Sequence, residues 1–391
     1  MSQDDEHLVL KQISSLREVG ADEWNRIAGD SPFLRHEFLV ALEHSGCVGP
    51  ATAWQPSYLA LRDGGDKLIA ALPLYLKYDS RGEFVFDWSW ADAYDRAGLD
   101  YYPKLVCAIP FTPATGARFL LDPSLRAEPL VRRLLSGARR VAGEAGASSI
   151  HVLFPSEAEK DWLDSDGFLS RKSCQFHWHN EGYRDFDDFL GRFSSAKRKK
   201  ARRERRRIAE ANISFEQLRG DEPSADDWDA IFDFYSRTFM RRGRPPYLNR
   251  AMFDEISRTM PENLVIMLAR YERQPIATAI CFRGGDTLYG RYWGSLADFH
   301  SLHFETCYYQ GIEYCIREGL QRFEPGTQGE HKISRGFRPT ATWSCHYLNN
   351  PNFHAAVEEF LTRESSHIDA YIEQAQDHVP YRRDSAGNET R

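Results

Sequence analysis

The sequence predicts an α+β protein in which one domain plan occurs twice, each copy being a mixed, mostly antiparallel sheet flanked by helices. Each half contains short apolar segments separated by Gly/Asp turns, the pattern of an antiparallel meander. Each half then shows an apolar period of three to four residues, which predicts a helix, and a further apolar segment. Residues 166–178 (DGFLSRKSCQFHW) also match residues 335–347 (RGFRPTATWSCHY) in their Gly-Phe pair, polar run, Cys and His-aromatic pair.

The chain is long enough for more than one such domain. It has 391 residues, of which 42% are hydrophobic, and this length favours two or three domains. The internal match places the join near residues 180–185. We therefore expect one domain at 1–183, a second at 184–380, and a disordered polar tail at 381–391.

In the first half, short apolar or aromatic runs between turn residues predict the strands. Ser31-Pro32 is a helix-start signal for a helix over 33–44. Residues 91–104 form an aromatic and acidic insert, and 110–116 form a loop. The strands are predicted at 8–13, 57–61, 68–78, 83–90, 105–109, 149–154 and 175–178, and the remaining helices at 21–28, 129–144 and 156–164.

The second half follows the same order. Three antiparallel strands are predicted at 264–270, 275–282 and 288–293. A helix over 304–320, an extended segment over 323–332, a turn at 335–337 and a strand over 341–348 then complete a crossover unit. The spacing of Phe353, Val357 and Leu361 predicts a last helix over 351–374.

Composition excludes several classes of protein. The acidic start, MSQDDEHLVL, lacks the apolar region of a secretory signal, and no run approaches the roughly 20 apolar residues of a membrane span. The seven cysteines lack a C-x-x-C pair and are predicted to be reduced thiols. These features predict a cytoplasmic protein without a transmembrane segment.

One helix carries most of the positive charge. Residues 192–207 hold ten Lys/Arg and one Glu, although the whole chain has a net charge of −7. The predicted helix, 194–211, would attract the phosphates of a tRNA acceptor arm, coenzyme A or an anionic lipid. The alternative is a solvated helix whose arginines pair with carboxylates of this chain. We take its phosphate-binding candidates to be Arg198, Lys199, Arg202 and Arg206.

The segment 289–348 concentrates side chains that could perform chemistry. Amide-forming acyl transfer needs a base for the amine proton and donors for the developing oxyanion. Residues 303–309 enter the predicted helix, and 328–335 end the adjacent strand, so both could meet at one sheet edge. We expect Glu305 or His331 to be the base and Tyr308 or Tyr309 the proton donor, with Lys332 or Arg291 facing an anionic substrate. The candidate catalytic residues are Glu305, His331, Tyr308, Tyr309 and His303.

Two alternatives remain for these residues. They could form a buried polar network that fixes the helix against the sheet. They could also bind a metal, but His-x-x-His-x-Glu at 300–305 is not the His-Glu-x-x-His spacing that places two ligands on one helical face. We therefore expect no metal site.

The aromatic insert of the first half could line a pocket for a polar acceptor, or could be a packed lid. Its candidate substrate-binding residues are Trp90, Asp92, Tyr94, Tyr102 and Lys104. The following loop, with Thr112, Thr115 and Gly116, could have no ligand, because turns of this composition are common.

The order of elements resembles two tandem GNAT-like (acyl-CoA N-acyltransferase) domains. The motifs resemble more closely those of the FemAB-like predicted N-acyltransferase family, which is related to Fem-type peptidoglycan aminoacyltransferases. The motifs are SWADAY (89–94), YYPK (101–104), PFTPATG (110–116), QFHW (175–178), GRYW (290–293), LHFETCYY (302–309) and GEHK (329–332).

The resemblance implies an enzyme that moves an acyl or aminoacyl group from an activated donor to a small-molecule or peptide amine. It implies no tightly bound cofactor, with acyl-CoA or aminoacyl-tRNA as co-substrate. It also implies that Thr112, Thr115 and Gly116 lie in the loop that binds the pyrophosphate of a phosphorylated cofactor, where backbone N–H groups precede a helix. The second half has SLADFH (295–300), without glycines, where the acyl-CoA loop would lie, so the donor stays open. The further substrate-binding candidates are Gln175, His177, Arg291, Tyr292, Trp293, Gln328, Glu330, Lys332 and Arg335.

Two other functions stay open. The fold could serve as a non-catalytic module that binds nucleic acid or a membrane surface through the basic helix. A metalloenzyme is the less favoured alternative. The oligomeric state does not follow from the sequence.

Overall fold

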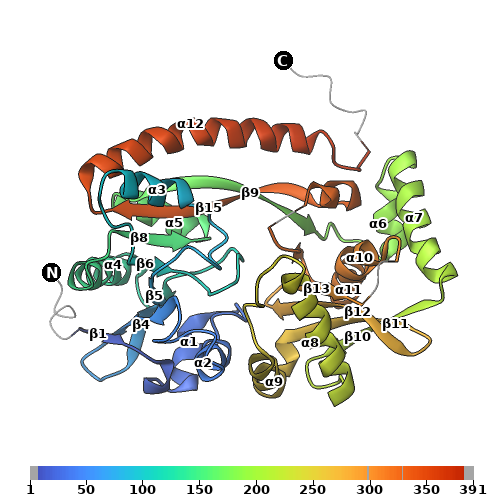
Figure 1. The fold of residues 1–391 in the computed structure, drawn as a ribbon, viewed down its shortest axis with the longest axis horizontal. Coiled ribbons are helices and arrows are strands. Elements are labelled where there is room, and N and C mark those ends of the chain that lie inside the picture. The colour runs from blue at the N-terminus through green and yellow to red at the C-terminus, as the bar shows by residue number, and fades with distance from the viewer. Residues whose placement is uncertain (1–7, 297–298, 328, 383–391) are drawn as a thin grey trace. The chain divides into compact units, whose positions relative to one another are not determined.

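The computed structural model describes residues 8–296, 299–327 and 329–382, and the chain can be followed by colour in Figure 1. It divides into two compact units. Unit 1 comprises Met1–Ser173, Tyr247–Met260 and Ala341–Asp369, and unit 2 comprises Cys174–Pro246, Pro261–Thr340 and Ala370–Arg391. Neither unit is one continuous stretch, whereas the sequence predicted a single boundary after residue 183.

In the described part of unit 1 the strands form two groups. The first has the order β1-β3-β4-β7, and the second the order β2-β5-β6-β8-β15. β6 and β8 are parallel because helix α4 crosses between them, and the other pairs are antiparallel. The strands are β1 (Val9–Ile13), β2 (Trp54–Pro56), β3 (Tyr58–Arg62), β4 (Leu68–Leu72), β5 (Leu74–Lys77), β6 (Lys104–Cys107), β7 (Leu120–Leu121), β8 (Ser149–Leu153) and β15 (Arg338–Leu348, which begins in unit 2).

Helices cover these strands. The apolar stripe of α4 (Ala127–Glu144) includes Leu134, Leu135 and Ala138, which are buried in one cluster with Leu59 and Ile150 of the strands. The other helices with residues in unit 1 are α1 (Ala21–Ala28), α2 (His36–His44), α3 (Trp88–Arg96), α5 (Glu157–Ser165), α9 (Arg250–Thr259), a 3₁₀ helix (Leu16–Glu18) and α12 (Pro351–Gln376), which continues into unit 2.

Unit 2 repeats this plan in the order β10-β11-β12-β13-β14-β9. The first four strands are antiparallel neighbours, and β13 and β14 are parallel with a helical crossover between them. The strands are β9 (Leu169–His179, which begins in unit 1), β10 (Ile213–Arg219), β11 (Leu264–Tyr271), β12 (Gln274–Gly284), β13 (Thr287–Ser295) and β14 (Arg322–Glu324). The helices are α6 (Phe186–Gly191), α7 (Ser195–Glu210), α8 (Ala225–Met240), α10 (Leu302–Phe304), a π-helical turn (Glu305–Tyr309), α11 (Gln310–Glu318) and 3₁₀ helices at Pro261–Asn263 and Glu330–Arg335.

The two matched sequence segments have the same local structure. Gly167 and Gly336 have φ angles of 83° and 95°, and each precedes a strand of 11 residues, β9 or β15. Glycine adopts this left-handed conformation without the steric cost of a Cβ. The strands nevertheless complete the sheet of the opposite sequence half, because β15 pairs with β8 and β9 pairs with β14. This exchange explains why each unit contains residues from both halves.

Two predicted strands are wrong. The segment 83–90 was expected to be extended, but α3 begins at Trp88 and buries Trp90 and Tyr94, which are four residues apart on one helical face. The segment 323–332 forms a strand only to Glu324 and is followed by the 3₁₀ helix that begins at Glu330. Gly326 and Gly329 have positive φ angles of 93° and 108°, which interrupt an extended chain.

The polar tail predicted at 381–391 begins with two residues that the structure describes. The Tyr381 hydroxyl donates to the Gly336 carbonyl at 2.6 Å, and the Arg382 backbone N–H donates to the Arg192 carbonyl at 2.9 Å. Residues 383–391 lie outside the described residues, as does the predicted substrate-binding residue Gln328.

Candidate active site

The candidate active site of unit 2 lies where two parallel strands separate. β13 pairs with β14 only from Thr287 to Tyr289, since β14 ends at Glu324 while β13 continues to Ser295. The carboxyl ends of neighbouring parallel strands are where α/β folds place ligands. The predicted substrate-binding residues Arg291, Tyr292 and Trp293 lie on this continuing part of β13.

Two predicted catalytic residues form a hydrogen bond. Tyr308, in the π-helical turn, has its Oη 2.8 Å from Nε2 of His331 in the 3₁₀ helix. Burial raises the pKa of Tyr308, so its hydroxyl keeps the proton and donates to the imidazole. Burial, with the nearby Arg335 and Lys332 cations, lowers the pKa of His331, so the ring is neutral at pH 7 and can accept.

His303 joins this pair. The centroid of its ring lies 5.6 Å from that of His331, 5.4 Å from that of Tyr308 and 5.1 Å from that of Trp293. Burial lowers the pKa of His303 to about 4, so this imidazole is also neutral at pH 7. Three of the five predicted catalytic residues therefore come together, next to Trp293 of β13.

A pocket of about 420 Å³ opens beside His331. Its wall includes Glu330, whose carboxylate accepts the Tyr371 hydroxyl at 2.9 Å. A pocket of this size with several polar side chains suits a small polar substrate. It is lined by Lys197, Glu330, His331, Ile333, Ser334, Tyr371, Gln374, Ala375 and His378.

Lys332 and Arg335 fix the segment that carries His331. The buried Lys332 Nζ donates to the Gly326 carbonyl at 2.5 Å, and burial lowers the pKa of this amine to about 7. The Arg335 guanidinium donates to the His331 carbonyl at 2.6 Å and to the Glu204 carboxylate at 2.8 Å. These contacts favour a positioning role for Arg335.

Glu305 and Tyr309 have their polar groups directed to other partners. The Glu305 carboxylate accepts from Arg205 Nε at 3.1 Å and from Gln310 Nε2 at 2.8 Å. The Tyr309 hydroxyl donates to Glu204 at 2.6 Å. Burial raises the pKa of Glu305, which is 3% exposed. Glu305 therefore contacts α7 and α11, and Tyr309 contacts α7, so their predicted catalytic roles stay predictions.

The pocket residues predicted in the first half have different environments. Trp90 and Tyr94 are buried in α3, whereas Asp92 on the same helix is exposed. Lys104 is fully buried, and its Nζ donates to Ser80, Glu83 and Asp87. Tyr102 shares the Ser80 hydroxyl at 2.8 Å.

This cluster of unit 1 contains polar residues that the sequence analysis missed. Tyr101 donates its hydroxyl to Asp87 at 2.6 Å, and the Nδ1 atoms of His151 and His346 lie 2.6 Å apart. Burial lowers the pKa of both imidazoles, so one neutral ring donates to the other. The signal in the sequence is Ser-x-His, which occurs at 149–151 and 344–346, with Ser149 and Ser344 hydrogen-bonded to the adjacent histidine.

The same i, i+2 arrangement occurs on β9. Gln175 and His177 are both buried, and His177 Nε2 lies 3.3 Å from Gln175 Oε1. Burial lowers the pKa of His177 to about 3. Gln175 and His177 match Ser344 and His346 in the internal repeat, so each copy keeps one neutral histidine with an adjacent polar partner. Their predicted substrate-binding role stays a prediction.

In the loop predicted to bind a phosphorylated cofactor, several backbone groups are hydrogen-bonded within the protein, whereas the buried Thr115 hydroxyl has no hydrogen-bond partner among the described residues. The buried Arg118 guanidinium donates to the carbonyls of Ala114, Gly116, Ala117 and Leu153. The Gly116 N–H donates to the Phe154 carbonyl, and Thr112 is buried. α4 begins at Ala127, so Thr112, Thr115 and Gly116 are not at its start. Their role as cofactor ligands stays a prediction.

The basic helix α7 has one buried and one exposed face. Ala201, Glu204 and Ile208 are buried, at a helical spacing. Arg202 pairs with Asp187 at 2.9 Å and Arg206 with Glu210 at 3.6 Å, whereas Lys199 is exposed and Arg198 is half-buried. Some of the positive charge is thus neutralised within unit 2, and the rest faces solvent.

Comparison with known proteins identifies the family. A model of the FemAB-like family, described as peptidoglycan biosynthesis/recognition, matches residues 15–383. The chain belongs to the FemAB-like family. No curated protein matches it significantly.

Solved structures with the same fold include FemX, at 12% identity and a TM-score of 0.54, covering 90% of this chain and 100% of FemX. L-PGS from Bacillus licheniformis aligns at 11% identity and a TM-score of 0.50, covering 86% of this chain and 98% of that one. The predicted α+β fold class is confirmed, since the fold of FemX aligns over 90% of this chain and over its own full length. At 11–12% identity these likenesses show the fold that this chain shares with FemX and L-PGS.

Two searches of the described residues bear on the other hypotheses. Within residues 8–296, 299–327 and 329–382, no helix has the length and apolar character needed to cross a bilayer. In the same part of the chain, no group of three His, Cys, Asp or Glu residues is arranged to hold a metal ion.

Proposed function

We propose that this FemAB-like protein forms an amide by moving an acyl or aminoacyl group from an activated donor to an amine, with Tyr308 and His331 of unit 2 transferring the proton. The observation that carries the proposal is the 2.8 Å contact between Tyr308 Oη and His331 Nε2 beside a pocket of about 420 Å³. Proton transfer by a positioned side chain requires such a distance.

The reaction assigns a role to each member of the pair. The amine nitrogen forms a bond to the donor's carbonyl carbon, and the bond from that carbon to sulfur or oxygen breaks. The nitrogen loses one proton to the Tyr308 oxygen as Tyr308 passes its own proton to His331. The proton then returns along the same path to the leaving thiolate or alkoxide. A neutral His331 is required for this step, and its lowered pKa supplies it.

The donor is an acyl-CoA or an aminoacyl-tRNA, both of which carry phosphates. Cations of α7 supply a surface for them, and Lys197 also lines the pocket of His331. A phosphate-rich polyanion such as tRNA binds with a steep dependence on salt, whereas a single coenzyme depends on it less. Nothing found in the comparisons favours tRNA, so both donors belong in the assay.

The decisive experiment measures amide formation by mass spectrometry with a panel of amine-bearing peptides. Acyl-CoA and aminoacyl-tRNA are supplied in separate reactions. His331→Asn and Tyr308→Phe should each lower kcat by about 10²–10⁴-fold, the contribution of a positioned acid or base. Tyr314→Phe is the matched control, because it removes a hydroxyl that accepts from Arg283 and lies outside the pocket of His331. A His331→Asn enzyme with the kcat of the wild type would refute the proposal.

A further inference from the structure

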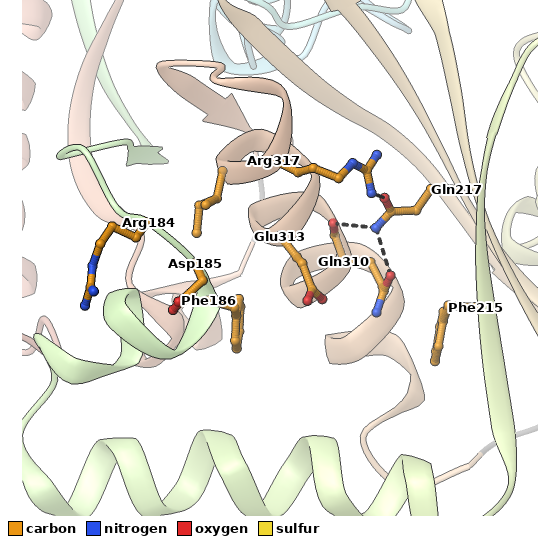
Figure 2. A pocket seen from close by; sticks show the side chains of 9 residues that line it. Arg184, Asp185, Phe186, Phe215, Gln217, Gln310, Glu313 and Arg317 are labelled. Atoms are coloured by element: carbon orange, nitrogen blue, oxygen red, sulfur yellow. Dashed lines mark hydrogen bonds between the residues drawn. The ribbon is translucent and has the colours of Figure 1, made fainter.

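A second pocket of unit 2 lies on the side of the π-helical turn where Glu305 faces α7. Its volume is about 580 Å³. Glu313 and Arg317 lie four residues apart on α11, so they share one face of that helix. Figure 2 shows the lining side chains, which are Arg184, Asp185, Phe186, Phe215, Gln217, Gln310, Glu313, Ile316 and Arg317.

At the Glu313 end of this pocket two carboxylates share one guanidinium, whereas Arg184 and Arg317 line its other walls. Arg205 NH2 lies 2.7 Å from Glu313 and 3.0 Å from Glu305, so one cation serves both carboxylates. Glu305 is buried behind Gln310, while the Glu313 side chain is 41% exposed and reaches the pocket. Two carboxylates around one guanidinium leave a negative charge that a ligand cation can neutralise.

Aromatic side chains stand on either side of these polar groups. In Figure 2 the Phe186 ring and the Phe215 ring lie on opposite sides of Glu313 and Gln310. Phe186 is buried and belongs to α6, and Phe215 is half-buried on β10. Such walls accept an apolar stem, and their ring faces also attract a cation.

The opposite charge lies one helical turn away. Arg317 is exposed on α11, and its guanidinium holds the Gln217 amide oxygen at 2.5 Å. Gln217 in turn donates to Gln310 at 3.0 Å, which fixes the polar wall between Arg317 and Glu313. Arg317 Nε also pairs with Glu318 at 3.1 Å. Because a guanidinium carries five N–H donors, Arg317 retains further donors for a ligand carboxylate.

From this arrangement we propose that the pocket binds an aminocarboxylate with an apolar stem. Its ammonium group lies against Glu313, the stem between Phe186 and Phe215, and the carboxylate against Arg317. This is a binding site separate from the pocket of His331, and it does not depend on the proposed transfer reaction.

Three probes of the same chain length separate the contributions of the ammonium and the carboxylate to binding. 6-Aminohexanoate has an ammonium, a stem and a carboxylate, hexylamine lacks the carboxylate, and hexanoate lacks the ammonium. Calorimetry or ligand-observed NMR on the full chain gives each Kd without any assay of activity. We expect 6-aminohexanoate to bind more tightly than hexylamine, and hexanoate to bind most weakly.

Two variants assign the ends of the ligand. Glu313→Gln should weaken 6-aminohexanoate and hexylamine by about tenfold or more, the usual effect of losing a hydrogen bond to a charged group. Arg317→Gln should weaken the binding of 6-aminohexanoate and leave the Kd of hexylamine unchanged. Asp233→Asn, which removes a surface carboxylate from an i, i+4 pair with Arg237, is the control and should leave every Kd unchanged.

The site is overturned by any of three results. These are hexanoate binding as tightly as 6-aminohexanoate, Glu313→Gln binding 6-aminohexanoate as the wild type does, and no binding of 6-aminohexanoate up to about 10 mM, where binding free energy falls below roughly 3 kcal/mol. His331→Asn should retain wild-type binding here. If it abolishes binding, the ligand occupies the other pocket and the assignment is wrong.

Discussion

Tyr308 Oη lies 2.8 Å from His331 Nε2, and this contact joins the π-helical turn to the 3₁₀ helix 23 residues later. A π-helical turn often marks a functional site, because it changes which side chains share a helical face. Here Tyr308 points from the turn to His331, and Glu305 points from the same turn to Arg205. One short segment therefore directs its polar groups to two different partners, His331 and Arg205.

The Tyr308 contact predicts how His331 titrates. Burial, with Arg335 and Lys332, lowers the pKa of His331 below its usual value of about 6.5. A hydroxyl that donates to the neutral ring should oppose protonation further. Tyr308→Phe removes the donor and keeps the ring, and should raise this pKa by on the order of half a unit to one unit. NMR titration of the His331 ring protons measures it. An unchanged pKa in Tyr308→Phe would mean that the hydrogen bond does not form in solution.

The buried ion pair between Glu204 and Arg335 should matter for stability. Their atoms lie 2.8 Å apart, with side chains 7% and 2% exposed. Glu204→Gln keeps the shape but leaves the Arg335 charge buried without its partner, which costs about 3–5 kcal/mol. Urea unfolding measures this loss. Glu210→Gln, in the exposed pair with Arg206, should change stability by less than about 0.5 kcal/mol, and an equal loss in both variants would contradict the prediction.

Glu83 in unit 1 should make stability fall as pH rises. Burial raises its pKa to about 7, although Lys104 opposes the shift. Because this value lies above the unfolded value of about 4.5, the folded state binds the proton more tightly between these limits, and the stabilisation is lost as pH rises through 7. Glu83→Gln cannot ionise, so the loss of stability between pH 5 and pH 8 should be smaller than in the wild type. Thermal unfolding at both pH values measures the difference. Equal losses of stability in the wild type and in Glu83→Gln would mean that Glu83 does not take up the proton.

Gly294 on β13 should tolerate no side chain. A Cβ there would lie 2.0 Å from the Phe234 carbonyl oxygen and 2.6 Å from the Tyr235 nitrogen, which are backbone atoms of α8. Gly294→Ala should cost about 2 kcal/mol or more, since strand and helix must separate. Gly143→Ala on α4, where a Cβ meets nothing within 4 Å, should instead raise stability by about 0.5 kcal/mol. A Gly294→Ala variant as stable as the wild type would show that β13 and α8 are farther apart than this contact requires.

Much of the fold could be predicted because its signals are local. The apolar stripe of α4 and the Gly-Phe pairs before β9 and β15 are features of neighbouring residues. The errors occurred where local signals compete. The aromatic run at 88–94 has strand-forming residues, but burying Trp90 and Tyr94 together requires a helix.

The candidate site was predicted as a region but not as a set of contacts. The sequence brought 303–309 and 328–335 together as a hypothesis, and His303, Tyr308 and His331 do lie together. The sequence did not show which of Tyr308 and Tyr309 contacts His331, because the direction of each side chain depends on the π-helical turn. It also gave no reason to expect the pocket of Glu313 and Arg317, whose walls come from three distant segments.

The sequence by itself determined the duplicated α+β plan, the positions of most helices and strands, and the concentration of reactive side chains near the C-terminal half of the chain. Only the tertiary structure decided that β9 and β15 exchange between the halves, that the Ser-x-His pairs meet in unit 1, and which carboxylates share Arg205. The physical reason is the distance along the chain over which each kind of interaction acts. Helical periods and turn residues act over a few neighbours, whereas strand pairing, burial and ion pairing depend on which distant segments pack together.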